Sequence, residues 1–123
     1  MSVKININKL DKDAVNPLEN KNDVLELTCI TKEIKNNYVE YGTGINIEIP
    51  KGYAGILFPI ETIYKTDLIA KDSIGVINPN NKEEIKIRFL VTENTLPHTY
   101  NVGDKIARLI ILPVAKYDFK WKE

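Results

Sequence analysis

The chain has few of the residue types that usually perform chemistry. It contains one histidine, His98, one cysteine, Cys29, and two arginines, Arg88 and Arg108. His98 follows a proline in an expected loop and has no second histidine or cysteine nearby in the sequence, so it indicates neither a metal site nor a catalytic triad. Cys29 lies in an apolar segment and is expected to be a buried small residue. Arg108 is the candidate for anion binding, because a guanidinium can bind a carboxylate or a phosphate through two hydrogen bonds.

Three glutamates, Glu26, Glu61 and Glu84, could serve as metal ligands. Each of the first two also has a plainer explanation. Glu26 alternates with apolar residues and can be a solvent-facing strand residue, whereas Glu61 can cap a turn or face solvent. Arg108 can form an ion pair with Glu61 or Glu84, on a neighbouring strand or subunit, instead of binding an anion. We therefore expect no metal site, with Glu26 as the weak candidate.

Length and composition restrict the class of protein. The chain has 123 residues, 43% hydrophobic and 28% charged, which is typical of one globular domain, here residues 1–123. Seventeen basic residues balance seventeen acidic ones, so no cationic field for nucleic acid or anionic lipid is expected. No apolar run approaches the roughly 20 residues of a membrane span, and no secretory signal is recognisable. These features predict a cytoplasmic protein without a disulfide framework.

Hydrophobic residues alternate with polar ones along most of the chain, which predicts strands. The alternating segments are 3–8, 45–49, 85–91 and 117–121. Two continuously apolar runs, 54–58 and 106–112, predict strands that are covered on both faces. The window Glu61–Lys71 allows one or two helical turns at most. The predicted fold class is all-β, a sandwich or barrel.

Three segments, in order, resemble conserved motifs of the trimeric dUTPases. Tyr41–Gly55 is similar to that family's TG-apolar-x-apolar-x-apolar-P-x-G-Y-x-G stretch, Gly75–Ile85 to its uracil-binding hairpin, and Gly103–Ile110 to GDRIAQLI. The resemblance covers nearly the whole chain. It implies a distorted jelly-roll barrel that assembles as a homotrimer, with active sites between subunits.

The chain departs from the family pattern in the hairpin. The resemblance implies a general-base Asp at the position of Asn78, but an amide cannot take up a proton near neutral pH. It also implies a Tyr that packs on the deoxyribose, at the position of Asn81. The plainer explanation of this segment is a turn made of Asn and Pro. In dCTP deaminase, which shares the fold, an essential Glu would fall on Arg88, so deamination is disfavoured.

The other departures concern the phosphates. Where the family has P-R-S-x-L, this chain has Ile60 in place of the Arg and Glu61 in place of the Ser, so a cation is lost and a negative charge is gained. Glu26 stands at the Asp that the resemblance associates with magnesium, and Arg108 stands at a Gln that contacts the nucleotide. The Gly-rich arm that closes the family's site is not found after Gly103.

These departures lead to the expectation of a catalytically inactive homotrimer with a structural, assembly or interaction role. A viral capsid is one such assembly, and the virion would then be the location. Tyr117, Phe119 and Trp121 would dock the C-terminal tail on a neighbouring subunit. The alternatives are a divergent enzyme that hydrolyses dUTP to dUMP and pyrophosphate, which would need Mg²⁺, and a regulatory nucleotide-binding module. For the inactive protein no cofactor is expected.

Overall fold

The computed structural model describes residues 3–18, 24–70, 75–91 and 98–123, and within these ranges the chain is almost entirely strands. The strands are β1 (Ile7–Lys9), β2 (Leu25–Thr28), β3 (Thr31–Ile34), β4 (Tyr38–Gly42), β5 (Ile45–Ile47), β6 (Tyr53–Pro59), β7 (Leu68–Ala70), β8 (Gly75–Ile77), β9 (Lys86–Val91) and β10 (Lys105–Pro113). The helical content of the described ranges is one 3₁₀ turn, η1 (Glu61–Lys65). The all-β prediction is confirmed. The predicted window Glu61–Lys71 holds this turn and then β7, while its last residue lies outside the described ranges.

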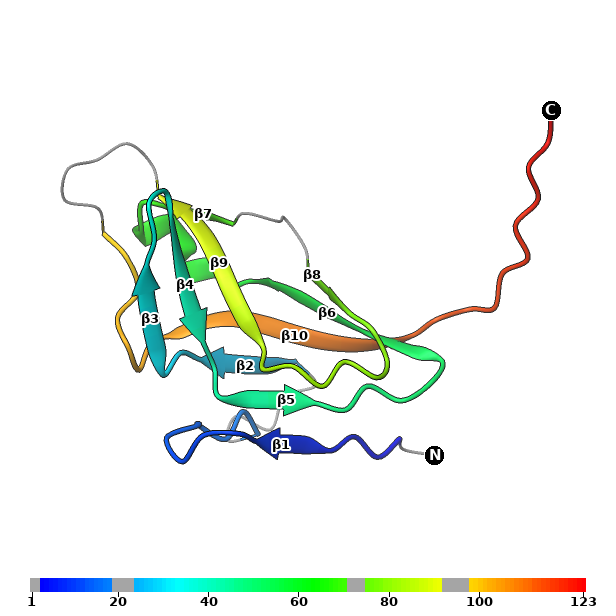
Figure 1. Ribbon diagram of the computed structural model, residues 1–123, viewed down its shortest axis with the longest axis horizontal. Coiled ribbons are helices and arrows are strands. Elements are labelled where there is room, and N and C mark those ends of the chain that lie inside the picture. Colours follow the sequence, from blue (N-terminus) through cyan, green and yellow to red (C-terminus); the bar gives the residue numbers. More distant parts are fainter. Residues whose placement is uncertain (1–2, 19–23, 71–74, 92–97) are drawn as a thin grey trace.

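Two four-stranded antiparallel sheets form the body of the molecule. Their strand orders are β2-β10-β6-β8 and β3-β4-β9-β7, and β1 pairs with β5 in a small third sheet. In Figure 1, β4 and β9 cross in front of β6 and β10, and β5 and β1 run along the lower edge. Neighbours in a sheet are mostly far apart in sequence: β10 lies between β2 and β6. The fold therefore places the last strand, β10, between strands from the first and the middle part of the chain.

Side chains of both sheets meet in one core cluster. Tyr41 of β4 and Phe89 of β9 are fully buried, and they pack with Ile106 and Ala107 at the start of β10. The rings of Tyr41 and Phe89 meet edge to face, with centroids 5.8 Å apart, a geometry that aromatic pairs favour. A second cluster, around Ile47 of β5, closes the other end of the barrel. Cys29 belongs to the first cluster and is buried, as the sequence indicated.

The alternating segment 45–49 contains strand β5, but its alternation does not reflect one exposed face. All three residues of β5 are buried, including Asn46, which is only 4% exposed. Alternation places polar residues in solvent only where one face of a strand is uncovered, and β5 is covered on both faces. The N-terminal alternation is also shorter than expected as a strand, since β1 begins at Ile7.

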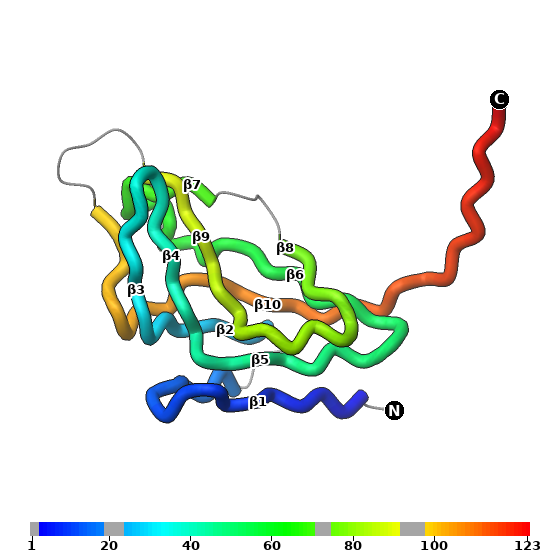
Figure 2. Tube along the Cα trace, in the orientation of Figure 1, coloured from blue at the N-terminus to red at the C-terminus, as the bar shows by residue number. Residues whose placement is uncertain are grey.

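The C-terminal alternation does not form a strand within this chain. After Pro113 the residues are irregular, and Figure 2 shows them leaving the body of the molecule as an extended tail. Tyr117, Phe119 and Trp121 are 69%, 87% and 90% exposed. A strand needs a neighbouring backbone for its hydrogen bonds, and the single chain offers none here. Docking of the tail on another subunit stays a prediction.

Candidate functional site

The hairpin that follows β8 is a compact turn at the edge of a sheet. Asn78 and Asn81 lie in this turn and are both exposed, and the Asn81 backbone N–H donates to the Asn78 carbonyl over 3.3 Å. Asn80 has a φ of +70°, a left-handed conformation that Asn adopts more readily than most residues. The turn chemistry proposed from the sequence is thus present, and neither Asn78 nor Asn81 brings a carboxylate or an aromatic ring to this place.

The β4–β5 turn holds the returning limb of the hairpin. Thr43 is buried, and its hydroxyl donates to the Ile85 carbonyl over 2.7 Å. The Gly44 N–H donates to Oε2 of Glu84 over 3.0 Å, and the Ile85 N–H donates to the Ile45 carbonyl over 2.9 Å. Glu84 is therefore a half-buried carboxylate with one oxygen held in place by a backbone N–H.

A pocket of about 270 Å³ lies beside this hairpin. It is lined by β8, by Asn46 and Asn81, and by the limb Glu83–Arg88. Within the described residues β8 is an edge strand, so one side of its backbone is not paired with β6 and carries N–H and C=O groups beside the pocket. Such alternating donors and acceptors can read the hydrogen-bonding edge of a nucleobase. Two carboxylates, Glu83 and Glu84, line the same pocket.

Arg108 lies between two carboxylates on the outer face of β10. Its Nη2 is 3.4 Å from Oε2 of Glu26, which stands directly opposite on β2, and 3.3 Å from Oε1 of Glu61 at the start of η1. Lys105 lies 3.3 Å from the other oxygen of Glu26. The Glu61 side chain is 73% exposed, whereas that of Glu26 is only 17% exposed. Of the two partners considered for Arg108, the structure places Glu61 beside it, while Glu84 bonds to Gly44 instead.

The electrostatics of this cluster keep Glu26 ionised. Burial raises the pKa of Glu26, but the hydrogen bonds and positive charges of Lys105 and Arg108 together outweigh it, so that the pKa lies below its ordinary value. A cluster of three or more His, Cys, Asp or Glu side chains fit to hold a metal ion does not occur among the described residues. Glu26 and Glu61, which both contact Arg108, do not form a ready-made metal site, and Glu84 lies apart on the hairpin.

The start of η1 is anchored by its neighbours rather than by a side-chain cap. Ile60 precedes the turn and is 5% exposed in the core cluster around Tyr41, so it packs as an apolar residue. The Thr62 hydroxyl is 3.1 Å from the Tyr100 hydroxyl, and the Tyr41 hydroxyl donates to the Tyr100 carbonyl over 2.9 Å. These contacts fix the turn that carries Glu61.

The single histidine, His98, and the single cysteine, Cys29, lie away from the hairpin pocket and from the Arg108 cluster. Nδ1 of His98 is 3.5 Å from Asp67, and the His98 side chain is 83% exposed. Sγ of Cys29 donates to the Asn101 carbonyl over 3.2 Å, and burial raises the pKa of its thiol. A buried thiol with a raised pKa is a poor nucleophile.

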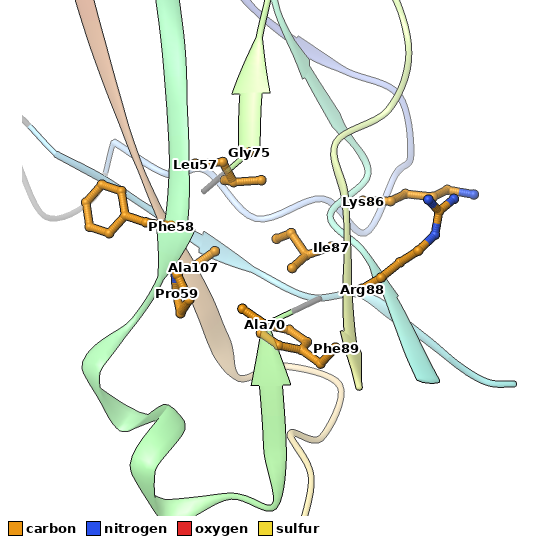
Figure 3. A pocket seen from close by; sticks show the side chains of 10 residues that line it. All are labelled: Leu57, Phe58, Pro59, Ala70, Gly75, Lys86, Ile87, Arg88, Phe89 and Ala107. Atoms are coloured by element: carbon orange, nitrogen blue, oxygen red, sulfur yellow. The ribbon is translucent and has the colours of Figure 1, made fainter. Parts of the chain in front are cut away.

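A further pocket, of about 120 Å³, opens between the two sheets and is shown in Figure 3. Leu57, Ala70, Ile87 and Phe89 give it an apolar lining, and the view shows the Arg88 side chain directed away from them. The Arg88 Nε instead lies 2.6 Å from Oε2 of Glu40. Among the described residues its lining contains no carboxylate, and its charged residues are Lys86 and Arg88.

Two residues near the candidate site, Asn46 and Lys105, were not identified from the sequence. Asn46 was assigned no role and is buried against the hairpin, and Lys105 joins the Arg108 cluster. The available signal for Asn46 was its place between two Ile residues, directly after the Thr43-Gly44 turn. A polar residue in a strand that is covered on both faces cannot face solvent. Lys105 lies in the segment that resembles GDRIAQLI, but its contact with Glu26 depends on the register of β10 with β2.

The chain matches known proteins over most of its length. A family model described as dUTPase matches residues 24–123. A deoxyuridine 5'-triphosphate nucleotidohydrolase of Leifsonia xyli is 33% identical over 78 residues, which are 63% of this chain and 51% of that protein. Another protein of that name, from Hydrogenobaculum, is 28% identical over 122 residues, which are 94% of this chain and 84% of that protein. The chain thus spans about half the length of the Leifsonia relative.

Solved structures share the fold. A dUTPase mutant from phage phi11 of S. aureus superposes with a TM-score of 0.76 at 17% identity, over 98% of this chain and 97% of that one. The dUTPase of Staphylococcus bacteriophage 80alpha with dUpNHpp gives 0.76 at 18% identity, over 99% and 89%. The predicted dUTPase-like jelly-roll barrel is confirmed.

The comparisons overturn one expectation. The absence of a base at Asn78 and of an Arg at position 60 led to the prediction of a catalytically inactive protein, but the similar proteins carry the name of a nucleotide hydrolase. The prediction was wrong because a departure at single motif positions does not by itself exclude an enzyme, and these findings support the alternative, a dUTP-hydrolysing enzyme, better than an inactive protein. The same fold carries other charged groups, among them the carboxylate of Glu84 and the guanidinium of Arg108. Among the described residues, no helix has the length and apolarity to cross a membrane.

Proposed function

The chain belongs to the dUTPase family, and from that premise we propose that it hydrolyses dUTP to dUMP and pyrophosphate. The observation that carries the proposal is the pocket of about 270 Å³ between edge strand β8 and the limb Glu83–Arg88. It lies on the segment that resembles the family's uracil-binding hairpin. The backbone groups of Gly75–Ile77 would bind the polar edge of the base, as an additional strand would.

Glu84 is the best-placed general base for this reaction. It lines the pocket, and the Gly44 N–H holds one of its oxygens, so the carboxylate has a fixed orientation. A general base held by a second group is a recurrent arrangement in active sites. In the proposed role Glu84 takes the proton from a water that attacks the α-phosphorus of dUTP. The bond from this phosphorus to the oxygen that bridges to the β-phosphate breaks, and pyrophosphate leaves. Asn78 cannot perform this step.

The Arg108 cluster is proposed to contact the phosphates. Arg108 and Lys105 are two cations on one strand, and the exposed Glu61 is the partner that an incoming anion can displace. An exposed ion pair is worth about 0–1 kcal/mol, so a triphosphate competes with it at little cost. Glu26 and Glu61 do not form a metal site of their own, and Mg²⁺ would arrive as part of the Mg–nucleotide substrate.

We also propose that the protein is a homotrimer. Its support is the tail, in which three aromatic side chains stand in solvent on a single chain. Exposed aromatic residues in a group mark a protein contact, and a second copy of the same chain is the simplest partner. In this assembly residues of one subunit can complete the pocket of the next.

The test is pyrophosphate release from dUTP in the presence of Mg²⁺, with dCTP and UTP as comparison substrates. We expect release from dUTP above that from the other two. Glu84→Gln, which keeps the acceptor for Gly44, should lower the rate by about 10²–10⁴-fold if it removes a general base. Glu83→Gln is the matched control and should keep most of the activity. Release from dUTP no faster than in buffer alone would refute the proposal.

A further inference from the structure

The side chain of Asn46 is unusual in this molecule because it is a carboxamide in the middle of a buried strand. It is 4% exposed, between Ile45 and Ile47 of β5. A buried amide is tolerated only when its hydrogen bonds are made. Its Nδ2 donates to the carbonyl oxygens of Asn81, over 2.9 Å, and of Glu83, over 3.0 Å. Because carbonyl oxygens only accept, these two partners fix which end of the amide faces the hairpin.

The other end of the amide is fixed by β1. Oδ1 of Asn46 accepts from Nδ2 of Asn8 over 3.1 Å, and the two residues stand directly opposite each other in the β1–β5 register. Directly opposed side chains are the closest neighbours across a pair of antiparallel strands. Asn8 therefore holds the Asn46 amide in the orientation in which both of its protons point to the hairpin.

Hydrogen bonds attach the hairpin to the body unevenly. The β6–β8 pairing ends at Ile77, and the Thr43-Gly44 turn holds Glu84 and Ile85. Among the described residues, the hydrogen bonds that join the segment 78–83 to the rest of the molecule both come from Asn46. Within the segment, the Glu83 N–H donates to Oδ1 of Asn81 over 2.9 Å, so a further hydrogen bond joins the two residues whose carbonyls accept from Asn46.

From this arrangement we propose that Asn46 is a positioning residue for the nucleotide pocket: its carboxamide sets where the turn 78–83 lies and so determines substrate affinity. Asn46 lines the pocket next to Asn81 and Glu83. The proposal rests on the proposed function for its kinetic consequence, but not for its structural one. The two N–H groups of the Asn46 amide hold the turn 78–83 in place. If a substitution removes these donors, the turn loses both hydrogen bonds and its fixed position.

The experiment compares Asn46→Asp with the unmodified protein. The variant keeps the size and the acceptor for Asn8, but turns both donors into acceptors that face two carbonyls. We expect the KM for dUTP to rise at least tenfold with a smaller change in kcat. We also expect the amide protons of Glu83 and Ile85 to exchange with solvent at least tenfold faster.

Two further variants keep the test decisive. Asn16→Asp makes the same chemical change at an exposed Asn whose Oδ1 accepts from the Leu18 N–H, and it should alter neither the KM nor the exchange of the hairpin. Asn8→Ala frees the amide without placing a charge, and it should speed exchange at Glu83 severalfold even if Asn46→Asp does not fold.

Because hydrogen exchange is measured without nucleotide, it distinguishes failure of the proposed function from failure of the positioning role. If the unmodified protein does not turn over dUTP but its hairpin loosens in Asn46→Asp, the proposed function is wrong and the positioning role stands. Exchange at the unmodified rate in folded Asn46→Asp, or in Asn8→Ala if the first does not fold, overturns the positioning role. An unchanged KM in an active, folded Asn46→Asp does so as well.

Discussion

The buried hydrogen bond of the Tyr41 hydroxyl allows a quantitative prediction of the stability of the variant Tyr41→Phe. Tyr41 is 0% exposed, and its hydroxyl donates to the Tyr100 carbonyl over 2.9 Å, next to the contact of Tyr100 with Thr62 in η1. Tyr41→Phe keeps the aromatic packing but removes this donor. A buried acceptor that loses its donor costs about 1–3 kcal/mol, so we expect a loss of about 1 kcal/mol or more in the free energy of unfolding at pH 7.

At high pH the difference in stability between the two proteins becomes smaller. Burial raises the pKa of Tyr41 to about 12, from an ordinary value of 10.0. Below pH 10 the phenol is neutral in both states, and between pH 10 and 12 only the unfolded chain gives up the proton. Unfolding is then favoured by about 1.4 kcal/mol per pH unit, or about 2.7 kcal/mol by pH 12. Tyr41→Phe lacks this destabilisation, so by pH 11 its stability deficit relative to the unmodified protein should be smaller by about 1.4 kcal/mol than at pH 7.

Urea unfolding at pH 7 and pH 11, at one fixed protomer concentration, measures both values. Other tyrosines and lysines titrate equally in the two proteins and cancel in the difference. Tyr64→Phe is the matched control, because Tyr64 is 77% exposed and its ring contact with Lys65 survives the change. A difference between Tyr41→Phe and the unmodified protein that stays the same from pH 7 to pH 11 would refute the assignment of a buried, neutral phenol.

Three more predictions concern the site and the assembly. Arg108→Leu removes a cation next to the mostly covered Glu26. The variant should have a KM for dUTP at least ten times higher, and this KM should depend less on salt. Steady-state kinetics at two ionic strengths would measure both effects. Gly44→Ala places a methyl group 2.5 Å from Cδ1 of Ile30 at a φ of +71°, and it should lower the unfolding free energy by about 1–3 kcal/mol; an unchanged melting temperature would contradict this. Truncation after Ala115 should lower the mass in light scattering from trimer toward monomer, and an unchanged trimer would show that the tail does not hold it together.

The sequence alone determined the fold class and the family. Period-two alternation and Gly, Asn and Pro turns are local properties, because the alternation follows from the pleat of a strand and the turns from backbone conformation. Asn80 at positive φ and the turn at Thr43-Gly44 stand where the sequence placed turns. The motif resemblance was confirmed by the family model, because the motif residues lie on these same turns and strands. A single domain over residues 1–123 stays a prediction.

Only the tertiary structure decided which residues meet. Arg108 and Glu26 are far apart in sequence and become opposite neighbours through the register of β10 with β2. Glu84 could have paired with Arg108, but the β4–β5 turn holds it at the hairpin instead. Asn46 has the alternation of a solvent residue and is buried, because the packing of other strands decides whether a strand has one covered face or two. The local sequence pattern determines to which face of a strand a residue points. The arrangement of strands that are distant in sequence determines whether that face is buried and which residues it contacts.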